Sequence, residues 1–215
     1  METPNFDHLS KFPSVYAPSE DTFLFLDALE QEIPFIQSLQ PNIIAEIGSG
    51  SGVNIVALTK ALGDISAAQL AVDINSAACE ATKLTAEVNN VTIDVFNMNL
   101  LDSFRQNLFD IILFNPPYVV TESEEIFGNG IERSWAGGEH GREIMDKLFP
   151  KLPTLLSENG VFYLVAIKEN NPEEIMDIMT REYNFISTII KERRILGEHL
   201  YILKFQKSCI KSKCS

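Results

Sequence analysis

The sequence predicts one α/β domain built on a seven-stranded, mostly parallel sheet with an antiparallel hairpin at its C-terminal end. Short apolar runs alternate with longer amphipathic segments along the 215 residues, which is the pattern of strands and crossover helices. Some apolar runs, such as 161–167, are unbroken, which indicates strands buried on both faces. The last two runs are separated by a turn too short for a crossover helix, so these strands should pair antiparallel.

The expected elements follow the chain in a regular order. A helix at 20–30 begins after Ser19, which can cap it, and places Glu20 and Asp21 in its first turn, where the helix dipole favours acids. The expected strands are 43–47, 67–73, 92–97, 110–114, 161–167, 185–191 and 199–205. The expected helices between them are 53–62, 77–89, 141–156, interrupted by Pro150 and Pro153, and 172–183. We expect residues 1–14 and 207–215 to be flexible and the domain to span 15–206.

Composition and charge exclude several classes of protein. The formal net charge is −13, so we expect no autonomous binding of nucleic acid, because lysine and arginine contacts to phosphate supply most of that affinity. Three cysteines, Cys79, Cys209 and Cys214, form no CxxC pair, which argues against a zinc site and a disulfide framework. The acidic N-terminus lacks the pattern of a signal peptide, and no apolar run approaches a membrane span. We expect a cytoplasmic protein, with the nucleus also open.

A glycine-rich turn follows the first expected strand. The string is Glu46-Ile-Gly-Ser-Gly-Ser-Gly52, which differs from the G-x-G-x-x-G dinucleotide fingerprint because Val53 stands where the third glycine would be. Glycines allow close approach of a ligand, and the acid before Gly48 and Gly50 favours an ammonium group over a phosphate. These features predict a site for S-adenosylmethionine, which has an ammonium, a carboxylate and an adenosine. The alternative is a tight turn whose glycines serve packing alone.

Asp73 ends the next expected strand, beside the glycine-rich turn. Its two carboxylate oxygens can accept hydrogen bonds from both hydroxyls of a ribose. The alternative is a cap for the helix that begins near Ser76. Together with the first motif, the position favours the ribose role.

The string Asn115-Pro-Pro-Tyr118 comes directly after a buried strand. Two prolines, Pro116 and Pro117, stiffen the chain and hold Asn115 extended. The Asn115 side-chain oxygen and the Pro116 carbonyl can then accept the two hydrogens of a planar NH2 group, on which Tyr118 can stack. An amide nitrogen is a weak nucleophile that must be aligned with the methyl group, and two acceptors serve that purpose. The alternative is a rigid surface turn.

Other candidate sites are weaker. The loop from Trp135 to Arg142 follows the Asn-Pro-Pro-Tyr string and can either face a substrate or simply connect two elements. His8, His140 and His199 have no paired spacing with cysteines or carboxylates, so structural roles are favoured, and we expect no metal site.

Several strings together resemble the eukaryotic and archaeal HemK-type glutamine methyltransferases. They cover about 15–205 and are Val15-Tyr-Ala-Pro-Ser-Glu-Asp-Thr-Phe23, Glu46–Gly52, Asp73-Ile-Asn75, Asn115–Thr121, Trp135-Ala-Gly-Gly138 and Lys168-Glu-Asn-Asn-Pro-Glu-Glu174. The resemblance implies a Rossmann-like class I methyltransferase fold and N5-methylation of the glutamine in the Gly-Gly-Gln loop of the class-one translation termination factor. It also implies a heterodimer with a small zinc-binding activator subunit.

The resemblance also assigns roles to single residues. Thr22 should touch the methionine end of the cofactor, Glu46, Gly48 and Gly50 should line its site, and Asp73 should hold the ribose. Asn115, Pro116 and Tyr118 should act at the substrate amide in a pocket that Pro117 also shapes, with Asn115 bordering the cofactor. The family usually has Asp where Asn99 stands, before Leu100, to accept from the adenine amino group. Asn99 can still accept, and Asp102 is a possible substitute.

The activator fits an expected property of the sheet. The strand 92–96 should lie at an edge, apolar and unpaired, and a partner that adds a strand would cover it. Three alternatives remain open: methylation of histone lysines, N6-methylation of adenine in nucleic acid, and a binding subunit without catalysis.

Overall fold

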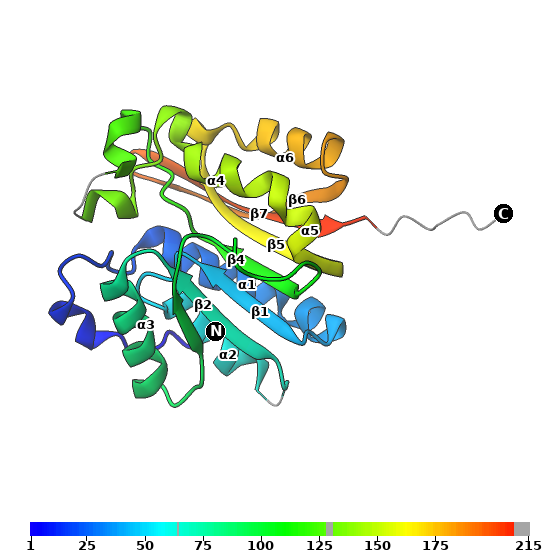
Figure 1. The fold of residues 1–215 in the computed structure, drawn as a ribbon. Coiled ribbons are helices and arrows are strands. Elements are labelled where there is room, and N and C mark those ends of the chain that lie inside the picture. Colours follow the sequence, from blue (N-terminus) through cyan, green and yellow to red (C-terminus); the bar gives the residue numbers. More distant parts are fainter. Residues whose placement is uncertain (64, 128–130, 209–215) are drawn as a thin grey trace.

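The computed structural model describes residues 1–63, 65–127 and 131–208, which form a seven-stranded sheet between two layers of helices (Figure 1). The strand order is β3-β2-β1-β4-β5-β7-β6. The first five of these strands pair in parallel, and β7 runs antiparallel to both β5 and β6. Their bounds are Ile43–Ile47 (β1), Ala68–Asp73 (β2), Asp94–Asn97 (β3), Phe109–Phe114 (β4), Leu156–Ile167 (β5), Phe185–Ile195 (β6) and Glu198–Lys207 (β7). The predicted sheet and its terminal hairpin are therefore confirmed.

In the described part of the chain, six α-helices cover the sheet. The first layer contains α1 (Glu20–Leu39), α2 (Val53–Leu62) and α3 (Ser76–Val88), in which α2 contacts both neighbours. On the opposite side lie α4 (Glu143–Leu148), α5 (Leu152–Leu155) and α6 (Pro172–Arg181) (Figure 1). Short 3₁₀ turns occur at Asp7–Lys11, Ser123–Phe127, Ile131–Ser134, Glu139–Gly141, Phe149–Lys151 and Lys168–Asn170. Within these described residues, no helix has both the length and the apolar character that a bilayer crossing needs.

Several boundaries differ from the sequence prediction for physical reasons. Helix α1 continues nine residues beyond Glu30 and through Pro34, because burial of Ile36 outweighs the one hydrogen bond that the proline removes. The expected helix 141–156 is divided into α4, a 3₁₀ turn and α5, because its two prolines lack the N–H groups that a continuous helix needs. The last three strands are longer than expected.

The N-terminal segment packs on the domain, where the sequence suggested a flexible arm. His8 and Leu9 are buried in the 3₁₀ turn Asp7–Lys11. The His8 Nε2 atom lies 2.9 Å from Thr85 Oγ1 on α3, and Asn75 Nδ2 donates to the Ser14 carbonyl at 3.1 Å. At the other end, β7 includes Lys207, and residues 209–215 of the expected tail, with Cys209 and Cys214, lie outside the described residues.

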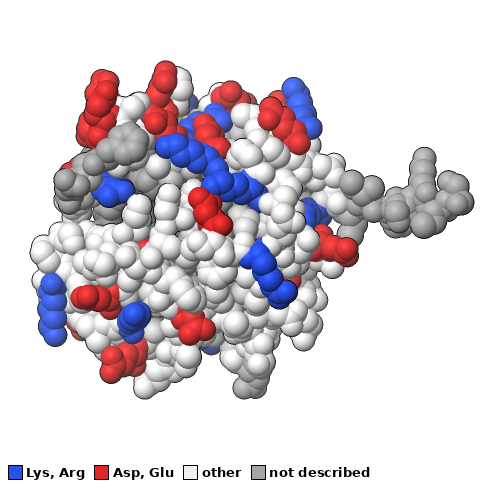
Figure 2. Space-filling view, viewed as in Figure 1, with Lys and Arg blue, Asp and Glu red and all other residues white. Residues whose placement is uncertain are grey.

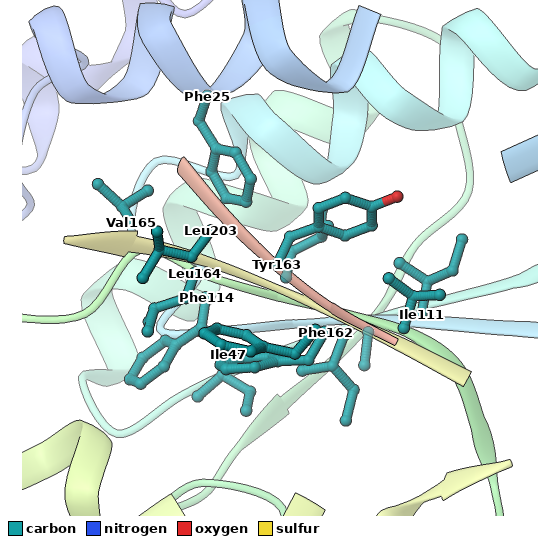
Figure 3. Packing of buried hydrophobic residues seen from close by; sticks show 14 of the residues in the cluster. Phe25, Ile47, Ile111, Phe114, Phe162, Tyr163, Leu164, Val165 and Leu203 are labelled. Atoms are coloured by element: carbon teal, nitrogen blue, oxygen red, sulfur yellow. The ribbon is translucent and has the colours of Figure 1, made fainter. Parts of the chain in front are cut away.

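The inner strand β5 is buried on both faces over 161–167, as its unbroken apolar run predicts. Tyr163 faces α1, where its hydroxyl donates to Glu32 Oε2 at 2.8 Å. Phe162 points to the opposite side (Figure 3) and stacks on Phe205 of β7, with ring centroids 5.8 Å apart. The core therefore has two halves, one on each side of the sheet, joined by alternating side chains of the same strands.

We expect Phe162→Ala to lower the free energy of unfolding by about 3–5 kcal/mol, because it leaves a cavity beside Phe205. Ile186→Ala on β6 is the control, since its side chain is 57% exposed, and should change stability by less than about 0.5 kcal/mol. Urea denaturation followed by circular dichroism measures both. Similar losses for the two variants would contradict the packing described for β5.

Candidate functional site

A cavity of about 780 Å³ lies at the carboxyl ends of the parallel strands, where the segments after β1, β2, β3 and β4 meet. This end of an open parallel sheet is the usual place for a ligand. All site residues proposed from the sequence line this one cavity: Thr22, Glu46, Gly48, Gly50, Asp73, Asn99, Leu100, Asn115, Pro116, Pro117 and Tyr118. The fold therefore brings together motifs that are up to 96 positions apart in the chain.

The glycine-rich turn between β1 and α2 forms one wall. Three of its glycines have positive φ angles, 62° at Gly48, 51° at Gly50 and 75° at Gly52, which other residues adopt at a cost. A Cβ atom on Gly52 would also lie 2.9 Å from Thr82 of α3. Thr82 and Thr85 donate hydrogen bonds to the carbonyls of Gly50 and Ser51, so α3 fixes the turn from behind. No sequence signal distinguished these two threonines from other helix residues.

Glu46, near the end of β1, is 1% exposed. Its Oε1 accepts from Asn54 Nδ2 at 3.1 Å and its Oε2 from the Ile55 N–H at 3.2 Å, both at the start of α2. Burial raises the pKa of this carboxyl from 4.5 to about 8, despite those two hydrogen bonds. A cationic group in the cavity would favour the ionised form, which agrees with the ammonium-binding role predicted from the sequence.

Asp73 joins the glycine-rich turn to the end of β2. Its Oδ2 accepts from the Gly50 N–H at 2.9 Å and its Oδ1 from the Asn75 N–H at 2.8 Å. Each oxygen keeps a second lone pair, so a diol can still bind here. The helix-cap alternative is wrong for this residue, because Asn75 is the N-cap of α3 and accepts from the Ala77 N–H. Burial raises the pKa of the Asp73 carboxyl.

Asp21 holds the Asn-Pro-Pro-Tyr segment in place. Its Oδ2 accepts from Asn115 Nδ2 at 2.9 Å and from the Tyr118 hydroxyl at 3.1 Å, and its Oδ1 accepts from the Thr22 N–H at 2.7 Å. The Asn115 Oδ1 atom is buried and has no hydrogen-bond partner within the part of the chain that the structure describes. The donor end of the amide is therefore fixed to the protein, and its buried acceptor end is left without a partner in a residue that lines the cavity.

This role of Asp21 was not predicted from the sequence. The residue was expected only to occupy a favourable position in the first turn of α1. In the structure the side chain is 4% exposed and lies on the cavity wall. Composition alone does not show which first-turn acid faces solvent and which faces the interior, so no signal in the sequence linked this residue to a motif 94 positions away.

Asn99 and Leu100 occupy the wall after β3. Asp102 was considered as a substitute for Asn99 in accepting from the adenine amino group. This alternative is wrong, because the Asp102 carboxylate pairs with Lys151 on the surface and Asp102 does not line the cavity. Of the two candidates, only Asn99 therefore lines the cavity.

The loop from Trp135 to Arg142 has two different ends. Trp135 lines the cavity, and its carbonyl accepts from the Val119 N–H at 2.9 Å. Arg142 is buried and pairs with Glu174 and Asp146, so it has a structural role. Of this loop, only the first end therefore lines the cavity.

The cavity has a strongly acidic lining. Arg133 is its one basic side chain among the described residues. Its acidic side chains are Glu20, Asp21, Glu46, Asp73 and Glu198. Burial and the neighbouring carboxylate of Asp21 raise the pKa of the Glu198 carboxyl. The site is therefore suited to a ligand that carries positive charge.

The raised pKa of Glu46 gives a pH dependence of stability. Between about pH 4.5 and about pH 8 the native carboxyl keeps a proton that the unfolded chain releases, so the unfolding free energy of the ligand-free protein falls as pH rises. Glu46→Gln removes this slope, and Asn54 can rotate its unpartnered Oδ1 toward the new amide. We expect the stability of the variant relative to wild type to increase with pH in urea denaturation experiments. A difference that is the same at every pH would contradict this assignment.

Comparison with known proteins supports the geometry. Residues 19–132 match the family model of the Methyltransferase small domain. The chain is 44% identical to Methyltransferase HEMK2 of Homo sapiens over 211 residues, 96% of this chain and 97% of the human protein. It is 36% identical to the eRF1 methyltransferase catalytic subunit mtq2 of Schizosaccharomyces pombe over 214 residues, 93% of this chain and 92% of that protein.

A solved structure extends the comparison to three dimensions. The E. cuniculi Mtq2-Trm112 complex, described as responsible for methylation of the eRF1 translation termination factor, contains a chain with 30% identity and a TM-score of 0.69. The match covers 91% of this chain and 99% of that one. The chain matches the Methyltransferase small domain and is similar over nearly its full length to HEMK2 and mtq2. It therefore belongs to the HemK-type glutamine methyltransferases and has their class I fold.

Proposed function

We propose that this chain is the catalytic subunit of an S-adenosylmethionine-dependent methyltransferase that acts on a glutamine side chain. Its substrate is the class-one translation termination factor, at the glutamine of the Gly-Gly-Gln loop. The observation that carries the proposal is the arrangement at Asn115, a residue of the cavity wall whose Nδ2 donates to Asp21 and whose buried Oδ1 has no partner among the described residues. The relatives named above support the choice of substrate.

The residues of the cavity can hold the cofactor along its whole length. Glu46 accepts from the ammonium group, Thr22 lies near the methionine end, and Asp73 accepts from the ribose hydroxyls. Asn99 accepts from the adenine amino group beside Leu100. The cofactor supplies a methyl group on a positively charged sulfur. The acidic lining favours that positive charge and so contributes to binding.

The Asn-Pro-Pro-Tyr segment binds and orients the second reactant. Asn115 Oδ1 and the Pro116 carbonyl accept the two hydrogens of the glutamine amide, and the Tyr118 ring gives it a flat surface. An amide nitrogen is a poor nucleophile, so fixing its lone pair in line with the methyl group lowers the barrier. As the nitrogen–carbon bond forms, the sulfur–carbon bond breaks, and the nitrogen loses a proton to water.

The charge distribution favours a protein substrate over nucleic acid. The face shown in Figure 2 carries both acidic and basic side chains, and the net charge is −13. A duplex would meet an acidic cavity mouth and would gain few phosphate contacts. A lysine ammonium lacks the planar NH2 group that two fixed acceptors select. We also propose a cytoplasmic location, where termination factors act.

We expect Asp21→Asn to reduce methyl transfer by at least about 100-fold while changing cofactor affinity by less than about threefold. The new amide turns an N–H toward Asn115, which then rotates and presents its own NH2 to the substrate. Asn115→Ala should lose as much transfer, because it removes the acceptor. Asp27→Asn is the control, since Asp27 lies on the same helix and pairs with Arg193 at the surface.

Methyl transfer is measured with the purified heterodimer and labelled cofactor. Three substrates are compared: a termination factor, a histone and a DNA duplex. Tandem mass spectrometry then locates the methyl group. Transfer to lysine or adenine in preference to glutamine would refute the proposed substrate. Equal loss of transfer and of cofactor affinity in Asp21→Asn would refute the proposed role of the amide.

We propose that the zinc-binding activator subunit covers the edge strand β3. This strand is the outermost of the sheet on its side, and Phe96 is 41% exposed there. Ile74 and Val88 beside it are also exposed apolar side chains. An edge of this kind can pair with a strand of a partner, which satisfies its backbone groups and buries its apolar side chains.

The chain expressed alone should be poorly soluble or inactive, and co-expression with the activator should restore both properties. Phe96→Asp should prevent co-purification, whereas Ile186→Asp at the opposite edge strand β6 should not. Size-exclusion chromatography and the transfer assay measure the outcome. A soluble chain with full activity in the absence of any partner would contradict the proposal.

A further inference from the structure

Asn170 is a buried polar residue that lies outside the cofactor and amide motifs. It ends the 3₁₀ turn Lys168–Asn170, which follows β5, and is 0% exposed. Its Oδ1 accepts from the Ile167 N–H at 2.8 Å. Its Nδ2 donates to the Tyr118 carbonyl at 2.8 Å and to the His140 carbonyl at 2.9 Å, with the Gly141 carbonyl at 3.4 Å. One planar amide therefore connects three separate segments of the chain.

Two of these segments border the substrate end of the cavity. Tyr118 ends the Asn-Pro-Pro-Tyr segment, and His140 belongs to the loop that begins at Trp135. Backbone bonds also join the segments, since the Val119 N–H donates to the Trp135 carbonyl at 2.9 Å and the Gly137 N–H to the Val119 carbonyl at 2.8 Å. The two segments also pack closely at Gly141, where an added Cβ atom would lie 2.0 Å from the Tyr118 carbonyl oxygen.

We propose that Asn170 is a positioning residue for methyl transfer, which rests on the function proposed above. Its Nδ2 holds the Tyr118 carbonyl, and the Tyr118 hydroxyl donates to Asp21, which in turn fixes Asn115. A shift of the Tyr118 backbone would therefore displace both the ring and the amide-orienting carboxylate. The same hydrogen bonds set the distance of the Trp135 loop from the Asn-Pro-Pro-Tyr segment.

The amide is the side chain that these three partners require. One N–H and two carbonyls need one acceptor and two donors in a planar arrangement, which Asn provides. Asp has the same shape but supplies no donor when ionised, so its oxygens would face the two carbonyls. A polar group buried in this way leaves its partners unsatisfied when it is lost.

The test compares wild type with Asn170→Asp in the activator-bound heterodimer, using the termination factor as substrate. We expect kcat to fall at least about tenfold and KM for the protein substrate to rise, with cofactor affinity within about twofold of wild type. Hydrogen–deuterium exchange should accelerate in 117–121 and 135–142 and stay unchanged in 47–55. Met179→Ala in α6, which is fully buried and is not one of the residues that line the cavity, is the control for a general loss of stability.

The possible outcomes separate the two proposals. If wild type transfers no methyl group to the termination factor, the proposed function fails. If wild type is active and Asn170→Asp has the kcat of Met179→Ala, Asn170 has a structural role only and the inference is overturned. A parallel loss of cofactor affinity in Asn170→Asp would also overturn it, because the effect would then extend to the glycine-rich turn.

Discussion

The hydrogen bond between Asp21 and Asn115 is the interaction on which the site depends. An asparagine amide has a donor end and an acceptor end of nearly equal size, and without a fixed partner it can present either to a ligand. The Asp21 carboxylate accepts only, so it selects one orientation. The same oxygen also accepts from Tyr118, so the polarity of the amide and the position of the ring are set together.

The remaining acids of the cavity raise the free energy of the ligand-free protein. Glu46 and Asp73 are desolvated, and burial raises the pKa of both carboxyls. The turn and the starts of α2 and α3 satisfy them in part, through hydrogen bonds from Asn54, Ile55, Gly50 and Asn75. A ligand with its own positive charge supplies the rest. The site therefore combines a rigid backbone, fixed by Thr82 and Thr85 of α3, with carboxyl groups whose ionised forms the ligand stabilises.

The sequence predicted those parts of the fold and site that local chemistry determines. Unbroken apolar runs identified the strands, and the short turn before Glu198 identified the antiparallel hairpin. Glycine spacing and two prolines identified the motifs around Glu46 and Asn115, which the structure places on one cavity. The contributions of Asp21 and Asn170 could not be predicted in this way, because each depends on partners that only the folded chain brings near.

At two places, a prediction from local sequence differs from the structure because contacts with distant residues decide the outcome. Pro34 would end many helices, but α1 continues because Ile36 packs in the core, so long-range packing outweighed a local rule. The arm at 1–14 has no periodic pattern, and its burial depends on the surface that α3 offers to Leu9. Sequence patterns report the preferences of a segment, whereas these two outcomes depend on its neighbours.

The docked N-terminal arm links two distant parts of the molecule. It touches α3 through His8 and continues to Ser14, Val15 and Tyr16, which form part of the cavity wall. A molecule that binds to this wall of the cavity stabilises the docked conformation of the arm. By thermodynamic linkage, docking of the arm strengthens binding of that molecule by the same free energy. An occupied cavity should thus shield the first sixteen residues from proteases, although most of them never meet the ligand.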